Sequence, residues 1–201
     1  QTREMIEYMS AVPGLVQENP SVGYLPTEEE EIIRRFIIYL IGRYMGASPK
    51  KGDSYSWVPN HLQDANGDLA PRSFLKCYAC AAKVMLQNPK TQASSIQGAV
   101  QEVSADRVAE LKEDFPWLEN LKTVLEGETL LMPGMEFRKK MKQLLDMDTK
   151  VKPPVRTVEE LMNLLMSLGI IQKNTDERIN MPEIYLHGFG LRRKGGLRRP
   201  K

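Results

Sequence analysis

The chain has 201 residues, 41% of them hydrophobic, with 28 basic and 26 acidic side chains, which is enough for one sizeable core or two small ones. No apolar run reaches the roughly 18 to 20 residues of a membrane span, and the first residues lack the basic-then-apolar pattern of a secretion signal. We therefore expect a cytoplasmic protein that has no membrane partner.

Prolines and glycines recur through residues 1–26, which we expect to be a loop-rich segment. The first long helix is predicted to begin at Thr27, because Thr27 and Glu30 have the spacing of a capping box. The glutamates that follow Thr27 favour the positive end of a helix dipole, so they are interpreted as a helix start and not as a cation site.

A loop is predicted from Gly46 to about residue 70. It contains the stretch DANGD, which begins like the calcium loop of an EF-hand. A calcium loop starting at Asp64 would need glycine at position 6 and glutamate at position 12, where this chain has Leu69 and Leu75. No metal site is therefore predicted.

A helix is predicted from Arg72 to about residue 86, with Pro71 in its first turn. It carries the two cysteines of the chain, Cys77 and Cys80, whose C-x-x-C spacing also occurs in redox and zinc sites. The apolar residues around them have helical spacing, so buried structural thiols are the preferred interpretation. Further helices are expected at about 104–114, 116–126 and 134–147.

The proline-rich stretch at residues 151–157 is expected to be a linker between domains. Thr157 and Glu160 then form a second capping box, and the leucine-rich helix that they begin is predicted to end at Gly169. Two short β-prone pieces around a polar turn follow and predict a hairpin. Helices followed by such a hairpin suggest a winged-helix module.

The predicted fold class is therefore mainly α: a helical domain, then a small α+β winged-helix domain, then a basic tail. The expected limits are 1–26 for the loop-rich segment, 27–150 for the helical domain, 151–190 for the winged-helix domain and 191–201 for the tail.

The tail concentrates positive charge, since six of the 28 basic residues lie at positions 192–201 and the rest of the chain has an acidic excess. Such segregation favours contact with an acidic partner, either DNA or a protein surface. A solvated terminus without a partner is the alternative. The residues expected to bind, from the hairpin and the tail, are Lys173, Arg178, Arg192, Arg193, Lys194, Arg198 and Arg199.

The glycines of the sequence GFGLRRKGG do not make a phosphate loop. After Gly188 and Gly190, the third glycine position of G-x-G-x-x-G is Arg193, and the chain contains no G-x-x-x-x-G-K-[ST]. The chain alone is therefore not predicted to hydrolyse nucleotides.

Two segments resemble bacterial P-loop ATPases of the AAA+/STAND kind. GRYMGASPKKGDSYSWVPNHLQDANGDLAPRSFL is similar to the segment after their nucleotide-binding core, and LGIIQKNTDERINMPEIYLHGFGLRRKGG is similar to their winged-helix ending. The similarity covers residues of about 32–86 and 157–197. It implies that the helical domain is lid-like and covers an ATPase core, and that Arg72 senses the nucleotide phosphates.

The phosphate loop and the magnesium-binding strand of such ATPases are absent from this sequence. The first hypothesis is therefore a non-catalytic C-terminal part of a P-loop ATPase, whose full-length form would bind ATP and magnesium through a missing core. The alternative is a stand-alone protein-interaction adaptor without nucleotide linkage. A small enzyme acting through His61 and Asp64 is a third hypothesis, with no nucleophile or metal set to support it.

Overall fold

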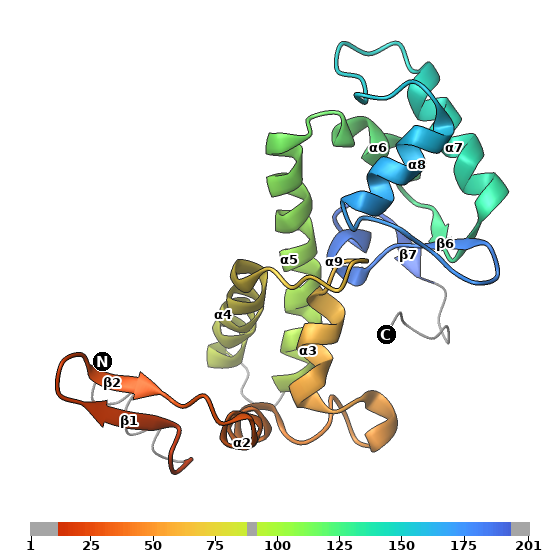
Figure 1. The fold of residues 1–201 in the computed structure, drawn as a ribbon. Helices are drawn as coiled ribbons and strands as arrows, with labels where there is room; N and C mark the ends of the chain where they lie inside the picture. The colour runs from red at the N-terminus through yellow and green to blue at the C-terminus, as the bar shows by residue number, and fades with distance from the viewer. Residues whose placement is uncertain (1–11, 88–91, 194–201) are drawn as a thin grey trace.

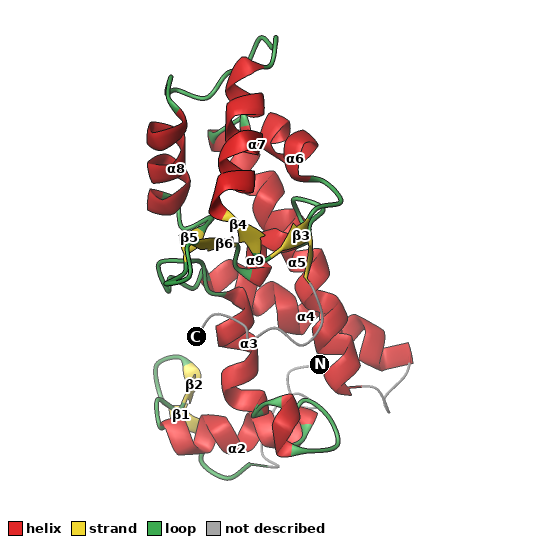
Figure 2. Ribbon diagram, turned by 90° about the vertical axis from the view of Figure 1, so that its right-hand side faces the viewer, coloured by secondary structure: helices red, strands yellow, loops and turns green. Residues whose placement is uncertain are grey.

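The computed structural model describes residues 12–87 and 92–193 (Figure 1). Over these residues the protein is mainly helical with a few small sheets, which confirms the mainly α class. Figure 2 shows α6, α7 and α8 at one end of the molecule, and α2 with the strands β1 and β2 at the other.

The described part of the expected loop-rich segment contains a β-hairpin. Strands β1 (Val16–Asn19) and β2 (Gly23–Pro26) pair antiparallel. The side chain of Asn19 shapes their turn, since its Oδ1 accepts hydrogen bonds from the backbone N–H groups of Ser21 and Val22. The prolines and glycines thus lie at the limits of short strands as well as in loops.

Helix α2 (Glu30–Ile41) begins three residues later than expected. The hydroxyl of Thr27 accepts from the backbone N–H of Glu29 at 3.1 Å, which is a turn contact, and no side chain caps the helix. The predicted capping box between Thr27 and Glu30 is therefore wrong, because the N–H of Thr27 still donates to the carbonyl of Leu15 beside the hairpin and the backbone stays extended at Glu29.

The expected loop after Gly46 contains a 3₁₀ turn, η1 (Pro49–Lys51), and helix α3 (Ser54–Leu62). Asp53 caps α3 by accepting from the N–H of Tyr55 at 3.1 Å. The helix tolerates Pro59 in its interior and buries Trp57, Val58 and Leu62. The prediction of a loop is therefore wrong for residues 54–62, where the apolar face and the cap outweigh the missing N–H of Pro59.

Two long helices form the centre of the helical part. Helix α4 (Pro71–Gln87) has Pro71 at its first position, as expected, and packs against α5 (Gln92–Asp114). With 23 residues, α5 is roughly 34 Å long. It also contacts α2, α3, α6 and α9, so it runs through both halves of the molecule (Figure 1).

The C-terminal half alternates helices with very short strands. In chain order these are α6 (Leu118–Leu125), β3 (Thr129–Leu130), β4 (Met132–Pro133), α7 (Gly134–Asp146), α8 (Val158–Ser167), β5 (Gln172–Lys173), β6 (Arg178–Asn180), α9 (Glu183–Leu186) and β7 (Arg192–Arg193). Strands β4, β6 and β5 form an antiparallel sheet in that order, and β3 pairs in parallel with β7. The predicted hairpin is confirmed as β5 and β6.

The expected boundary at residues 151–157 lies between α7 and α8, and elements from both sides of it pack together. Strand β4 comes before this stretch in the sequence and pairs with β6, which comes after it. Strand β3, also before the stretch, likewise pairs with β7, which follows it. One continuous set of buried apolar side chains runs from the helical part into the C-terminal half. Residues 151–157 therefore connect two helices within one packed body.

The second capping box is confirmed. Thr157 accepts from the N–H of Glu160 at 3.2 Å, and the Glu160 carboxylate accepts from the N–H of Thr157 at 3.0 Å. The N–H of Arg156 also donates to the Glu160 carboxylate, and this bond, together with those from Thr157, lowers the pKa of Glu160. The box defines the first turn of α8.

The DANGD loop of residues 64–68 holds the other end of α8. The N–H of Ala65 donates to the carbonyl of Gly169 at 2.8 Å, and the Asn66 side chain donates to that of Ser167 at 3.3 Å. Gly169 has φ of +67°, and a Cβ at this position would lie 2.4 Å from Oδ2 of Asp64. Glycine is therefore required twice here, by its backbone conformation and by the close approach of Asp64.

We predict that Gly169→Ala lowers the free energy of unfolding by about 3 kcal/mol, because it combines left-handed strain with overpacking. The Asp64 side chain cannot move aside without losing hydrogen bonds, since its other oxygen accepts from the N–H groups of Asn66 and Asp68. The matched control is Gly67→Ala, where φ is +88° but a Cβ meets nothing within 4 Å, so about 1 kcal/mol is expected. Urea unfolding measures both, and equal losses would contradict a role for the approach of Asp64.

Candidate functional site

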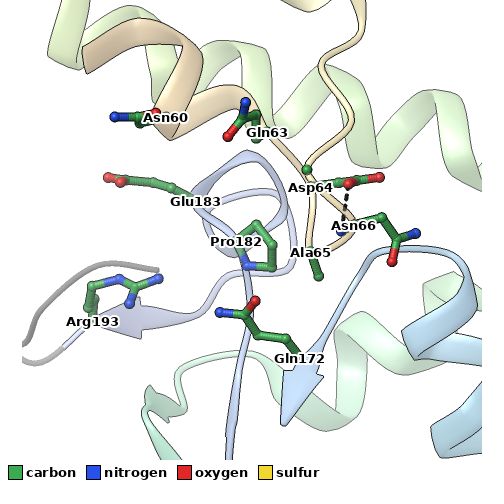
Figure 3. Close-up of a pocket in the computed structure, with 10 residues that line it drawn as sticks. Asn60, Gln63, Asp64, Ala65, Asn66, Gln172, Pro182, Glu183 and Arg193 are labelled. Atoms are coloured by element: carbon green, nitrogen blue, oxygen red, sulfur yellow. Dashed lines mark hydrogen bonds between the residues drawn. The ribbon is translucent and has the colours of Figure 1, made fainter. Parts of the chain in front are cut away.

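A polar pocket lies where the helical part meets the C-terminal half (Figure 3). We call it the junction pocket. It is lined from α3, the DANGD loop, β5, α9 and β7 by Asn60, Gln63, Asp64, Ala65, Asn66, Gly67, Gln172, Pro182, Glu183 and Arg193. Most of these side chains are amides or charged groups, so the pocket is a candidate for polar recognition.

The charged side chains of the junction pocket are engaged within the protein. The Arg193 guanidinium donates to Oδ1 of Asn180 at 3.2 Å and to the carbonyl of Met181 at 2.9 Å. One oxygen of Asp64 accepts from two N–H groups of its own loop. These contacts fasten β7 to the end of β6 and shape the DANGD loop.

His61 stands behind this pocket and links α3 to α9. Its ring stacks on Trp57 with 3.6 Å between the ring centroids, and its Nδ1 lies 2.6 Å from the Trp57 carbonyl. Its Nε2 lies 3.5 Å from a carboxylate oxygen of Glu183, whose other oxygen is 3.8 Å from Nε2 of His187. None of these contacts joins His61 to Asp64, whose Oδ1 accepts from the N–H groups of Asn66 and Asp68, so they lend no support to a catalytic pair of His61 and Asp64.

The junction pocket offers amide groups, two carboxylates and one guanidinium. Its described lining residues include no serine, threonine, cysteine or lysine that could act as a nucleophile. The lining contains two carboxylates, Asp64 and Glu183, and one guanidinium, so its net charge is unsuited to a nucleotide phosphate. The arrangement supports a structural junction between the two halves.

The glycines of the sequence GFG serve packing. A Cβ on Gly188 would lie 2.5 Å from the carbonyl oxygen of Ser104 and 2.4 Å from a methyl carbon of Val108, both on α5. The Gly188 N–H donates to the buried hydroxyl of Ser104 at 2.9 Å. Phe189 between the two glycines is fully buried. This segment therefore anchors the chain on α5, in line with the rejection of a phosphate loop.

The hairpin cations that were expected to bind a partner are paired within the hairpin. Lys173 lies 2.5 Å from Glu177, and Arg178 lies 3.5 Å from Asp176. All four side chains are exposed. Their charges largely cancel, which weakens the attraction of this loop for a phosphate backbone.

The exposed side of α8 is acidic and polar. Its exposed residues are Glu159, Glu160, Asn163 and Ser167. Glu159 forms an ion pair with Arg138 of α7, which lowers the pKa of Glu159. Carboxylates on this side repel phosphates, so α8 is poorly suited to the groove of DNA.

Of the other predicted binding residues, Arg192 is exposed on β7, and Arg193 is held by Asn180 and Met181 as described above. Lys194, Arg198 and Arg199 lie outside the described residues.

Arg72, the predicted nucleotide-sensing residue, is exposed in the first turn of α4. Its guanidinium forms an ion pair with Glu110 of α5 at 2.9 Å, and 78% of its side chain is accessible. Glu110 also pairs with Arg107 at 3.3 Å. A side chain this exposed can exchange its partner at little cost, so its sensing role stays a prediction.

Both cysteines are buried free thiols on α4, as the sequence indicated. Burial, together with the neighbouring Cys80, raises the pKa of Cys77 to about 12. Within residues 12–87 and 92–193, no group of three or more histidine, cysteine, aspartate or glutamate side chains could hold a metal ion.

Sequence reasoning missed a basic surface on α7 and the loop of residues 147–157. Lys139, Lys142, Lys150 and Lys152 are exposed there, and none of them forms an ion pair with another described residue. The signal was present, because residues 134–157 contain seven basic and three acidic side chains.

No helix in the described part of the chain combines the length and the apolar character needed to cross a membrane. Comparisons of the chain with protein-family models, curated proteins and solved structures gave no match.

Proposed function

We propose that the chain is a non-catalytic binding module whose residues 118–180 form a winged-helix unit. The observation that carries this proposal is the succession α6, β4, α7, α8, β5 and β6, with the strands ordered β4, β6, β5 in one antiparallel sheet. Helix, strand, two helices and a two-stranded wing is the order of a winged helix, with α8 in the place of the recognition helix. The unit would thus begin well before the linker of residues 151–157.

The partner that fits α8 and the wing is a protein. Their outer surface carries four carboxylates, Glu159, Glu160, Asp176 and Glu177, against the two cations of the wing. A DNA-reading helix places cationic or amide side chains against bases and phosphates. Mixed, internally paired charges suit a protein surface instead.

The link to nucleotide hydrolysis rests on the sequence resemblance. In a full-length P-loop ATPase, the helical part would act as the lid and a separate core would bind ATP and magnesium. The exposed position of Arg72 at the start of α4 leaves it accessible to such a core. The adaptor hypothesis keeps the same docking surface and removes the nucleotide.

The test is site-specific photo-crosslinking in the source cells. A photoreactive amino acid replaces Asn163 on α8 or Thr175 in the wing, and the control replaces Gln101 on the exposed side of α5. We expect protein adducts from Asn163 and Thr175 that resist nuclease and are absent from Gln101. Adducts that nuclease removes, or equal yields from all three positions, would contradict the proposal.

The crosslinked peptide also separates the two versions of the proposal. A peptide from a P-loop ATPase core, within the same polypeptide or another, supports the lid hypothesis. A peptide from a protein without a nucleotide site supports the adaptor.

A further inference from the structure

A second surface of the molecule, on α7 and the loop after it, differs from α8 and the wing because its lysines are not paired with carboxylates of the described residues. Helix α7 buries Phe137, Met141 and Leu144, and its helical geometry places Lys139 and Lys142 on the opposite side, toward solvent. The two lysines lie less than one turn apart. Neither pairs with a carboxylate of the described residues, although Asp146 lies one turn further along the helix.

The loop of residues 147–157 continues this surface at the end of α7 (Figure 1). It is longer than the turns of about three to four residues that usually join the helices of a helix-turn-helix. Lys150 and Lys152 are exposed in it and form no ion pair within the part of the chain that is described; Asp148 is the single acidic residue of the loop.

The loop is fixed to the body of the protein. The Asn120 side chain on α6 donates to the hydroxyl of Thr149 at 3.1 Å and to the carbonyl of Val151 at 2.8 Å. Pro153 is buried, and Val155 packs against the core. These contacts hold the backbone on both sides of Lys150 and Lys152, so the two charges are presented from an ordered surface.

The four lysines fit a polyanion that is long enough to reach both α7 and the loop. They converge on no enclosed pocket, so they are unsuited to one small anion. When several separate cations neutralise a row of phosphates, the release of counterions increases the affinity, and such binding needs no base contacts. Wing cations that are already paired offer much less of this gain.

We propose that α7 and the loop of residues 147–157 bind the phosphate backbone of duplex DNA, through Lys139, Lys142, Lys150 and Lys152. This surface is separate from the protein-docking surface of α8 and the wing, so the inference goes beyond the proposed function. Binding is independent of base sequence and leaves α8 free for a partner protein.

The experiment measures the fluorescence anisotropy of a labelled duplex of about 20 base pairs, titrated with the full chain between about 50 and 200 mM salt. The test variants are Lys139→Gln with Lys142→Gln, and Lys150→Gln with Lys152→Gln. The matched control is Lys50→Gln with Lys51→Gln, which removes two exposed lysines of η1 from outside both proposed surfaces. A further variant lacks residues 194–201, which separates the tail from the surface.

Each double variant is expected to weaken binding about tenfold at low salt. It should also reduce the magnitude of the slope of log K against log salt by about 2, since each lost phosphate contact lowers that slope by about 0.9. The Lys50→Gln, Lys51→Gln control should leave both quantities close to those of the unchanged protein. The same losses should occur in the tail-deleted background. Circular dichroism checks that the variants remain folded.

No binding of the unchanged protein at about 50 mM salt would overturn the proposal. The proposal would also be overturned if both double variants bound DNA like the unchanged protein while deletion of the tail alone abolished binding. Neither result affects the crosslinking test at Asn163 and Thr175, so failure of this inference is distinguishable from failure of the proposed function.

Discussion

Gly188→Ala is expected to lower the free energy of unfolding by about 3 kcal/mol, because it overpacks a contact between backbones. The new methyl group would lie 2.5 Å from the Ser104 carbonyl oxygen and 2.4 Å from a methyl carbon of Val108. The Ser104 oxygen belongs to the middle of α5 and cannot rotate away. Relief would require α9 to move off α5, which stretches the 2.9 Å hydrogen bond from Gly188 to the Ser104 hydroxyl.

The control for this prediction is Gly98→Ala on the same helix α5. A Cβ there meets nothing within 4 Å, so alanine should stabilise the protein by about 0.5 to 1 kcal/mol through its higher helix propensity. Val108→Ala combined with Gly188→Ala should cost less than the sum of the two single changes, since it removes the closest contact, at Cγ2, although Cβ of residue 108 at 2.7 Å and the Ser104 oxygen remain. Urea unfolding gives all values, and a loss below about 1 kcal/mol for Gly188→Ala would contradict the packing role.

The thiol of Cys77 is expected to react with a disulfide reagent at least about a thousandfold more slowly in the folded than in the unfolded protein at pH near 8. Burial and the neighbouring Cys80 raise its pKa from 9.0 to about 12, so the reactive thiolate is rare in the folded state. Absorbance of the released reagent measures the rate with and without urea, in a Cys80→Ala background. A native rate within about tenfold of the unfolded rate would contradict this expectation.

The same shift predicts how stability depends on pH. In the unfolded chain the thiol ionises near its ordinary pKa of 9.0, while the folded protein keeps the proton until about 12. The stabilising contribution of the protonated thiol is therefore complete below pH 9.0 and is lost as pH rises toward 12. Burial also raises the pKa values of Tyr78 and Tyr185, which add to the same alkaline loss. Unfolding midpoints measured across this range should fall less steeply for Cys77→Ala.

The local features of the fold were predictable from sequence, and the failures were of two kinds. The capping box at Thr157 and Glu160 formed because its bonds lie within four residues. The similar pattern at Thr27 failed because the backbone of Thr27 is bonded to Leu15 beside the preceding hairpin and the chain becomes helical only at Glu30. Helix α3 was missed because Pro59 disguised an apolar face that only burial against other helices stabilises.

Which charged side chains are available on the candidate surfaces depends partly on contacts between residues that are distant in sequence, and these contacts could not be predicted from the sequence. Nothing in the sequence shows that Arg193 is held by Asn180 and Met181, because a two-residue strand pairing decides it. The partners of the wing lysine and arginine lie within four residues and could have been anticipated as ion pairs. The basic surface on α7 could also have been found, by counting charges in windows instead of at the chain end.

The pairing of β3 with β7 has a consequence for biosynthesis. During translation, residues 118–146 leave the ribosome before β6 and β7 exist, so the edges of β3 and β4 have no partners. The apolar surface that Phe189 and Leu191 later cover is exposed over the same interval. The C-terminal half therefore completes its core only after residue 193 has been made, and until then its unpaired strand edges and uncovered apolar surface are exposed to chaperones and proteases.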